Sequence, residues 1–309
     1  MNGSRDVDGS PPTSDAPAVP APGDQPTGRQ TSGPLPQPPR RGLRLLAVVG
    51  PVVALLLATF LPAGLMARLP PMTETTPAGA VVVVVVTQSL VVCLVAIVLC
   101  AVLLRWHGLR LRDAGFRWTR VSLPSLLAGL AVGAVVVVAV GLPLTWLGLL
   151  RAAATPDLPW WGLLVAGLAQ ALLLQGFPEE LLFRGYQMTA LRLRPVKALL
   201  VSASVFAVLH LLSSGGQVNA VERVLYLALP FGFAVAAGAL MIVTDSLWAA
   251  VGVHAGVHVG TLLGLPLGLG NGPSLWVWCG VVWTAIGIAL LAVARRQGRL
   301  TLVWSGPHR

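Results

Sequence analysis

The stretch Gly176-Phe-Pro-Glu-Glu-Leu-Leu-Phe-Arg184 places two carboxylates and one guanidinium inside an otherwise apolar segment. A charged side chain at membrane depth costs a few kcal/mol or more, so it is rare, usually paired, and a marker of function. The chain around this stretch has 309 residues, of which 55% are hydrophobic and only 10% are charged. Because soluble domains carry about a quarter charged residues, this composition indicates a membrane protein.

Apolar runs long enough to cross a hydrocarbon core of about 30 Å recur along the chain. These runs lack the strict alternation of apolar and polar residues that marks a transmembrane β-barrel. The sequence therefore predicts an all-α fold, a polytopic transmembrane helical bundle of about eight spans. The predicted spans cover residues 43–66, 79–104, 122–144, 158–191, 196–213, 222–243, 246–264 and 274–294.

The segments that flank the apolar runs divide the chain into three parts. Residues 1–39 are rich in Pro, Gly and Ser and are predicted to form a disordered cytoplasmic tail. Residues 40–297 are the predicted transmembrane domain, and residues 298–309 a second cytoplasmic tail.

The net charge of +10 comes almost entirely from arginine. The basic residues gather before the first span and after the second, fourth and eighth spans: Arg40, Arg41, Arg44, Arg105, Arg110, Arg112, Arg117, Arg120, Arg192, Arg194, Lys197, Arg295, Arg296 and Arg299. With eight spans all these groups fall on one side, and basic loops mark the cytoplasmic side. Both termini are therefore predicted to be cytoplasmic, and the positive charge is interpreted as a topology signal rather than as a nucleic-acid site.

Ionisable residues inside the spans cluster in the second half of the chain: Glu179, Glu180, Arg184, His210, His254 and His258. Glu179 lies 16 residues before Pro195, and His210 lies 15 residues after it. At 1.5 Å per residue, both lie roughly 20 Å along their helices from the turn at Pro195. By the same count, His254 and His258 lie about 14 and 20 Å beyond the turn that precedes their span. Three separate spans thus bring ionisable groups to a similar depth.

The spacing of these residues adds detail. Glu180 and Arg184 are four residues apart, so they share a helix face and can pair. Glu179 is turned about 100° from Glu180 around the helix and can meet a different partner. The span that contains them is too long for an upright helix and is predicted to be tilted, or broken near Gly176 and Pro178.

Three kinds of chemistry suit such a cluster. A buried carboxylate and an imidazole can activate a water molecule, while imidazole N–H groups stabilise an oxyanion. Alternatively, Glu179, His210, His254 and His258 could bind Zn²⁺, which lowers the pKa of a bound water to about 7. A proton relay in a transporter also uses Glu and His.

The residues that carry the cluster resemble the CPBP intramembrane proteases, the CAAX prenyl protease and bacteriocin-processing family, also called Abi. Glu179-Glu180-Leu-Leu-Phe-Arg184 looks like the EExxxR motif of that family, and Phe206-Ala-Val-Leu-His210 matches its FxxxH motif. Ser246-Leu-Trp248 followed by His254-Ala-Gly-Val-His258 resembles its third region, SLW and then HxxxN. The resemblance covers about residues 158–264, in the order and spacing of the family.

The resemblance implies a role for each matching residue. Glu179 would be the base that activates water, with His210 as its partner, while Glu180 would support the site and pair with Arg184. His254 would donate to an oxyanion or bind a metal ion. The sequence departs from the family at His258, where Asn is usual. Histidine can donate a hydrogen bond as Asn does, but it can also bind a metal ion.

The resulting hypothesis is an intramembrane endopeptidase of the CAAX protease type, with Zn²⁺ as its cofactor or with none. Its predicted partners are a peptide or membrane-protein substrate and the lipid bilayer, and its catalytic cavity is expected to open toward the cytoplasm. The Ala-, Val-, Gly- and Arg-rich composition suggests a bacterial, multi-pass protein of the plasma membrane. The alternative is a non-proteolytic membrane protein, either an immunity or scaffold protein or a proton-coupled transporter.

Overall fold

A computed structural model describes residue 3 and residues 41–66, 68, 73, 76–153, 157–301 and 303–307. The predicted disordered tail at residues 1–39 lies outside these residues except for Gly3. The α-helices are α1 (Arg41–Met66), α2 (Ala78–Trp106), α3 (Ser122–Trp146), α4 (Trp160–Ala169), α5 (Phe177–Glu180), α6 (Met188–Leu191), α7 (Pro195–Leu209), α8 (Ala220–Tyr226), α9 (Ala228–Thr244), α10 (Leu247–Gly264) and α11 (Pro273–Arg296).

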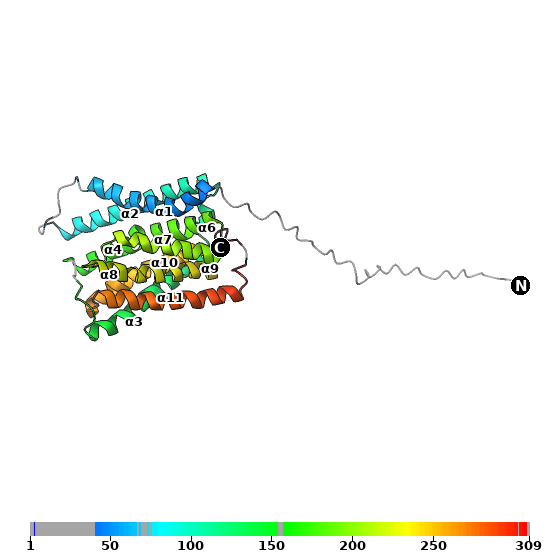
Figure 1. Ribbon diagram of the computed structural model, residues 1–309. Helices are drawn as coiled ribbons and strands as arrows, with labels where there is room; N and C mark the ends of the chain where they lie inside the picture. The colour runs from blue at the N-terminus through cyan, green and yellow to red at the C-terminus, as the bar shows by residue number, and fades with distance from the viewer. Residues whose placement is uncertain are drawn as a thin grey trace. The chain divides into compact units, whose positions relative to one another are not determined.

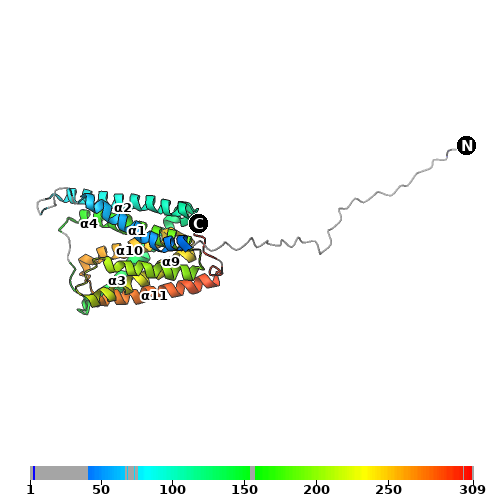
Figure 2. The same ribbon diagram turned by 45° about the horizontal axis from the view of Figure 1, so that its top comes forward.

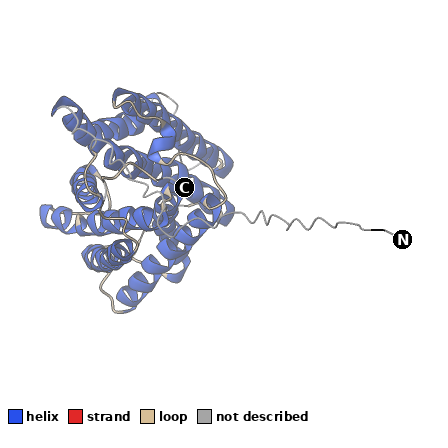
Figure 3. Cartoon of the chain, turned by 90° about the vertical axis from the view of Figure 1, so that its right-hand side faces the viewer, coloured by secondary structure: helices blue, strands red, loops and turns tan. Residues whose placement is uncertain are grey.

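Eight helical stretches are long and apolar enough to cross a membrane. They cover Arg41–Met66, Ala78–Trp106, Ser122–Trp146, Trp160–Leu191, Pro195–Leu212, Ala220–Thr244, Leu247–Leu267 and Pro273–Arg296, each within three residues of a predicted span. The described part of the chain contains helices and loops but no strand (Figure 3). The predicted all-α bundle of eight spans is therefore confirmed.

The long helices run side by side, so the loops gather at two ends of the bundle (Figures 1 and 2). We call the end formed by residues 41–44, 105–121, 192–194 and 295–301 the arginine-rich end. Hydrogen bonds hold it together. The Nε2 of His107 lies 3.0 Å from the carbonyl oxygen of Leu43, and the backbone N–H of Trp304 donates to Leu193 over 2.9 Å.

The opposite end consists of residues 147–153, 157–159, 213–219 and 268–272. Arg151 connects its loops, because its backbone pairs with that of Asn271 and its guanidinium donates to both carboxylate oxygens of Glu222 over 2.9 Å. The side chain of Asn271 donates to Gly215 over 2.9 Å. The loop that follows the fifth span is thereby fixed to the loops on either side of it.

The fourth span is continuous but irregular. Two π-helical segments, Gln170–Gly176 and Leu181–Gln187, flank the short helix α5 that carries the two glutamates. A Cβ at Gly176 would lie 2.5 Å from the carbonyl oxygen of Ala171, so only glycine fits this widened turn. The irregularity predicted near Gly176 and Pro178 is thus present as π-helical turns. These turns accommodate Pro178, which has no backbone N–H to donate, without breaking the helix.

Helix α10, which carries two of the histidines, packs closely against α3. Gly252 and Gly256 face α3 at a spacing of four residues, and Cβ atoms there would overlap the carbonyl oxygens of Leu126 and Leu130. Small residues at this spacing allow two backbones in a membrane to approach closely. The approach of α10 to α3 therefore determines where its histidines stand in the bundle.

We expect Gly256→Leu to destabilise the bundle by about 1–3 kcal/mol or more, because the larger side chain forces α3 and α10 apart. Gly79→Leu is the matched control, since a Cβ at Gly79 meets nothing within 4 Å. Thermal unfolding of the two purified variants in detergent measures the difference. Equal melting temperatures for the two variants would contradict the close packing of these helices.

Candidate active site

Arg184 and Glu180 form an ion pair inside the bundle. The Nε of Arg184 lies 3.1 Å from Oε2 of Glu180, and the two side chains are 1% and 0% exposed. The pair predicted from their spacing of four residues is therefore present. It compensates a charge that would otherwise be very costly at this depth.

Aromatic rings cover the rest of the guanidinium. The Cζ of Arg184 lies 4.4 Å from the ring centroid of Phe206 on α7 and 5.8 Å from that of Phe233 on α9. Its two terminal nitrogens have no hydrogen-bond partner among the described residues. The ring faces supply the electrostatic attraction that these nitrogens lack, so Arg184 connects the fourth span to the fifth and sixth.

His254 on α10 lies between the two glutamates. Its Nδ1 is 2.8 Å from Oε1 of Glu180, and its Nε2 is 3.8 Å from Oε2 of Glu179. Because a carboxylate can only accept a hydrogen bond, Nδ1 carries the hydrogen, and the Nε2 of a neutral His254 presents a lone pair toward Glu179. Glu179 Oε2 is buried and has no hydrogen-bond partner among the described residues. Glu179 Oε2 and His254 Nε2 thus face each other as two hydrogen-bond acceptors 3.8 Å apart.

His210 ends helix α7 and is oriented by its own backbone. Its Nδ1 lies 2.8 Å from the carbonyl oxygen of Phe206 and therefore carries the hydrogen, which leaves Nε2 with a lone pair. His210 lines two small cavities at once, one that it shares with Glu179 and one that it shares with His254 and His258. His210 thus lies between the part of the site that contains Glu179 and the part that contains His254 and His258.

The second of these cavities has a volume of about 60 Å³ and is walled by Phe206, Tyr226, Phe233 and the histidines. The rings of His254 and His258 are stacked there, with their centroids 5.3 Å apart. Neither ring nitrogen of His258 bonds to another described residue, so its N–H is available to a ligand. A space of this size holds a few water molecules.

The first cavity, which we call the α1/α7 pocket, has a volume of about 120 Å³. It is lined by Glu179 and His210 together with Leu55, Leu56, Thr59, Phe60, Leu209, Leu212 and Ser213. Apart from Glu179 on α5, these residues come from the second half of α1 and from residues 209–213 at the end of α7 and just after it, which lie toward the opposite end of the bundle. The pocket beside Glu179 therefore lies away from the arginine-rich end. The expected opening of the catalytic cavity toward the cytoplasm stays a prediction.

Three larger grooves of about 460–470 Å³ lie elsewhere on the bundle. Their lining residues include no ionisable side chain. They separate helices whose exposed faces are apolar, as a lipid-facing surface should be. Among the cavities described here, ionisable side chains line the two small ones and not these three grooves.

The predicted zinc ligands have suitable donor atoms, since Glu179, His254 and His210 each direct a lone pair toward the cavities. Within the described ranges, however, no three His, Cys, Asp or Glu side chains come close enough to bind one metal ion. In this arrangement the side chains lie too far apart to hold one metal ion together.

Several residues of the site carry no clear signal in the sequence. Phe233 and Thr59 come from spans with no matching motif, and only the packing of α9 and α1 brings them to the site. Trp248 of the SLW motif lies beside it: its indole N–H donates to Arg117 over 2.7 Å, and its ring stacks on Phe177 with centroids 5.6 Å apart. Trp248 thus holds the helix turn just before Glu179.

Residues 157–260 match the family model of type II CAAX prenyl endopeptidases, described as Rce1-like. The match contains all six predicted site residues and confirms the family that the three motifs indicate. A search of curated proteins found no match. The family supports a protease, that is, a hydrolase that acts on peptide substrates in a membrane. Together with the eight apolar helices, it indicates a multi-pass membrane protein.

We expect Arg184→Met to destabilise the protein by about 3–5 kcal/mol, because it leaves Glu180 buried beside no positive charge. The double variant Glu180→Gln with Arg184→Met removes both charges and should recover part of this loss. Thermal unfolding in detergent measures both. A double variant that is less stable than either single variant would contradict the pairing described here.

Proposed function

We propose that the chain is an intramembrane endopeptidase that hydrolyses a peptide bond with a water molecule held by Glu179. The observation that supports this most is the arrangement around His254, which bonds to Glu180 and presents its second nitrogen to the unpartnered oxygen of Glu179 at 3.8 Å. A base needs a free lone pair within reach of the proton that it takes. Glu179 Oε2 has one, whereas Glu180 Oε2 forms an ion pair with Arg184 over 3.1 Å and Glu180 Oε1 lies 2.8 Å from His254 Nδ1.

The proposed reaction conserves atoms and charge. Water donates its hydrogens to Glu179 Oε2 and His254 Nε2, and Glu179 takes one proton as the water oxygen attacks the carbonyl carbon of the substrate. The resulting tetrahedral intermediate carries a negative charge on the former carbonyl oxygen. Glu179 then returns the proton to the amide nitrogen as the C–N bond breaks.

The oxyanion needs hydrogen-bond donors. His254 uses its Nδ1–H for Glu180 and His210 uses its Nδ1–H for the backbone. His258 is the histidine of the cluster whose N–H has no partner among the described residues, so we assign the donor role to it. Asn, which is usual in the family at this position, would present an amide N–H in the same way.

Glu180 and Arg184 are positioning residues in this proposal. Glu180 fixes the tautomer and the ring orientation of His254, and Arg184 supplies the counter-charge beside Glu180. Zinc remains a prediction, because the same lone pairs could bind it if the side chains moved closer together. We further propose the bacterial plasma membrane as the location, and substrates that need not be prenylated.

Glu179→Gln should lower peptide cleavage by at least about 10²-fold, because the amide cannot take a proton although it fills the same space. Cleavage of a peptide library by purified protein in detergent measures this, with and without a chelator. Glu222→Gln is the matched control, since its carboxylate pairs with Arg151 at the opposite end.

Cleavage that survives Glu179→Gln would overturn the mechanism. If the chelator abolished cleavage and zinc restored it, the attacking water would be bound to zinc rather than held directly by Glu179. A Glu179→Gln variant that loses cleavage but keeps the melting temperature of the wild type would argue against a structural role for this side chain.

His258→Asn should keep cleavage within about tenfold of the wild type, because asparagine offers a comparable N–H donor. His258→Leu should lose about 10²-fold or more, as expected when an oxyanion donor is removed. The same peptide assay compares the two. If His258→Asn were as inactive as His258→Leu, the imidazole itself would be required, and the donor role would be wrong.

A further inference from the structure

A short segment that follows α11, residues 304–307, packs on the arginine-rich end, and we call it the strap. Three of its four residues are buried. The backbone N–H of Trp304 donates to the carbonyl oxygen of Leu193 over 2.9 Å. The carbonyl oxygen of Pro307 accepts a hydrogen bond from the guanidinium of Arg117 over 3.1 Å. The strap is thus fixed both to the loop after the fourth span and to the loop after the second.

The strap lies against residues 110–118 of the connection between α2 and α3, which we call the linker. Gly306 has a φ of 95°, and a Cβ there would overlap the carbonyl oxygen of Asp113. From the linker, Gly115 faces Pro307 in the same way, because a Cβ at Gly115 would overlap the proline ring. A residue without a side chain on each partner therefore allows the strap and the linker to pack backbone against backbone.

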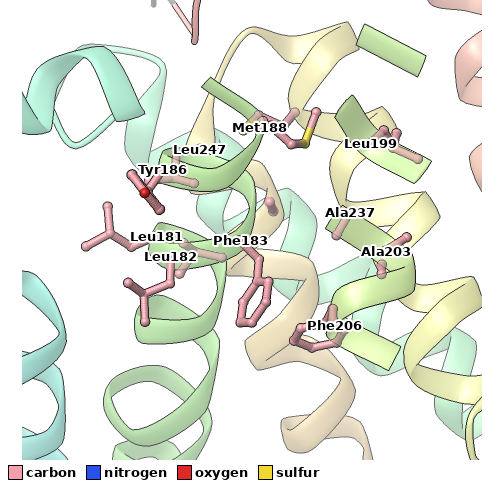
Figure 4. Close-up of a cluster of buried hydrophobic side chains, with 14 of the residues drawn as sticks. Leu181, Leu182, Phe183, Tyr186, Met188, Leu199, Ala203, Phe206, Ala237 and Leu247 are labelled. Carbon is pink, nitrogen blue, oxygen red and sulfur yellow. The ribbon is translucent and has the colours of Figure 1, made fainter. Parts of the chain in front are cut away.

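The linker also packs on the helices that carry the site. A Cβ at Gly185, in the second π-helical segment of the fourth span, would lie 2.7 Å from the carbonyl oxygen of Ala114. A Cβ at Gly115 would lie 2.9 Å from that of Leu247 at the start of α10. Leu247 belongs to the buried core that surrounds the fourth span (Figure 4). The linker is therefore in contact with the strap and with two helices of the site.

A path of direct contacts leads from the linker to the turn that carries Glu179. The carbonyl oxygen of Arg117 accepts the indole N–H of Trp248 over 2.7 Å. The ring of Trp248 stacks on Phe177, two residues before Glu179, and the ring of Phe116 lies 5.3 Å from the same phenylalanine. Arg117 thus bonds to the strap through its side chain and to Trp248 through its backbone.

We propose that the strap positions Glu179: it holds the linker against the site helices, and the linker holds the turn before Glu179 through Arg117 and Trp248. The residues of the strap and Arg117 are positioning residues, since they act through Trp248 and Phe177. A misplacement of 1 Å can cost about 10²-fold in rate, so release of the strap should slow cleavage. That consequence rests on the proposed function of Glu179, whereas the effect on the helix does not.

The strap is tested first without any need for activity. Gly306→Val places a branched side chain where the carbonyl oxygen of Asp113 lies and should release the strap. Gly42→Val is the matched control at the same end, since a Cβ at Gly42 meets nothing within 4 Å. Hydrogen exchange of the full-length proteins in detergent measures the local opening of each helix. We expect the amides of residues 177–187 to exchange at least about tenfold faster in Gly306→Val than in the wild type or the control.

A second variant reaches the same contact without new bulk. Arg117→Met removes the donor to Pro307 but keeps the backbone carbonyl that Trp248 uses. Its matched control is Arg120→Met, because Arg120 is an exposed arginine close by in the chain. Arg117→Met should also accelerate the exchange of residues 177–187, and Arg120→Met should not.

Two results would overturn the role of the strap. The first is exchange at residues 177–187 that equals that of the wild type in either strap variant. The second is exchange that accelerates equally in α9 and in residues 177–187 in both variants, because the effect would then be a general loss of stability rather than the release of one turn.

Cleavage then tests the consequence for the reaction. Arg117→Met should lower kcat for the best-cleaved peptide of the library by at least about tenfold and leave KM unchanged, because it misplaces the base and not the substrate. Arg117→Lys keeps a donor for Pro307 and should recover most of this loss. A lysine variant as slow as Arg117→Met, or a change in KM alone, would overturn the positioning role. A Glu179→Gln variant that still cleaves would instead overturn the proposed function and leave the exchange result standing, which keeps the two failures distinct.

Discussion

The buried guanidinium of Arg184 is the constraint on which the other contacts of the site depend. A charge at this depth is tolerated only with a close counter-charge, and Glu180 supplies it at 3.1 Å. The ring of Phe206 covers the guanidinium from the fifth span, and Phe233 approaches it from the sixth. Glu180 also bonds to His254 on the seventh span. The Glu180–Arg184 pair thereby connects four spans.

The same constraint separates the roles of the two adjacent glutamates. Glu180 is fully buried; its Oε2 forms an ion pair with Arg184, and its Oε1 shares a hydrogen bond with His254. Glu179, one residue earlier, is turned around the helix toward the small pocket and keeps an oxygen without a partner. Since the two carboxylates have the same intrinsic chemistry, only their surroundings distinguish a positioning residue from a base.

Backbone geometry brings these groups together. The π-helical segments on both sides of α5 alter the rotation of the fourth span at the two glutamates, and π-bulges are common at functional sites. On the facing side, Gly252 and Gly256 let α10 approach α3 so closely that their backbones touch. Because the two backbones are already in contact, α10 cannot move closer to α3. His254 on α10 therefore has little freedom to move away from the glutamates.

The sequence by itself determined the eight spans, because apolar runs of membrane length have few alternatives to a helix. It also determined the Glu180–Arg184 pair, because residues four apart on one helix are neighbours whatever surrounds them. The tertiary structure alone decided that His254 would choose Glu180 as its hydrogen-bond partner, and that Phe233 would approach Arg184. It also decided that the pocket beside Glu179 would lie away from the arginine-rich end. These contacts join residues far apart in the chain, and their partners depend on how helices rotate and approach, which local spacing does not encode.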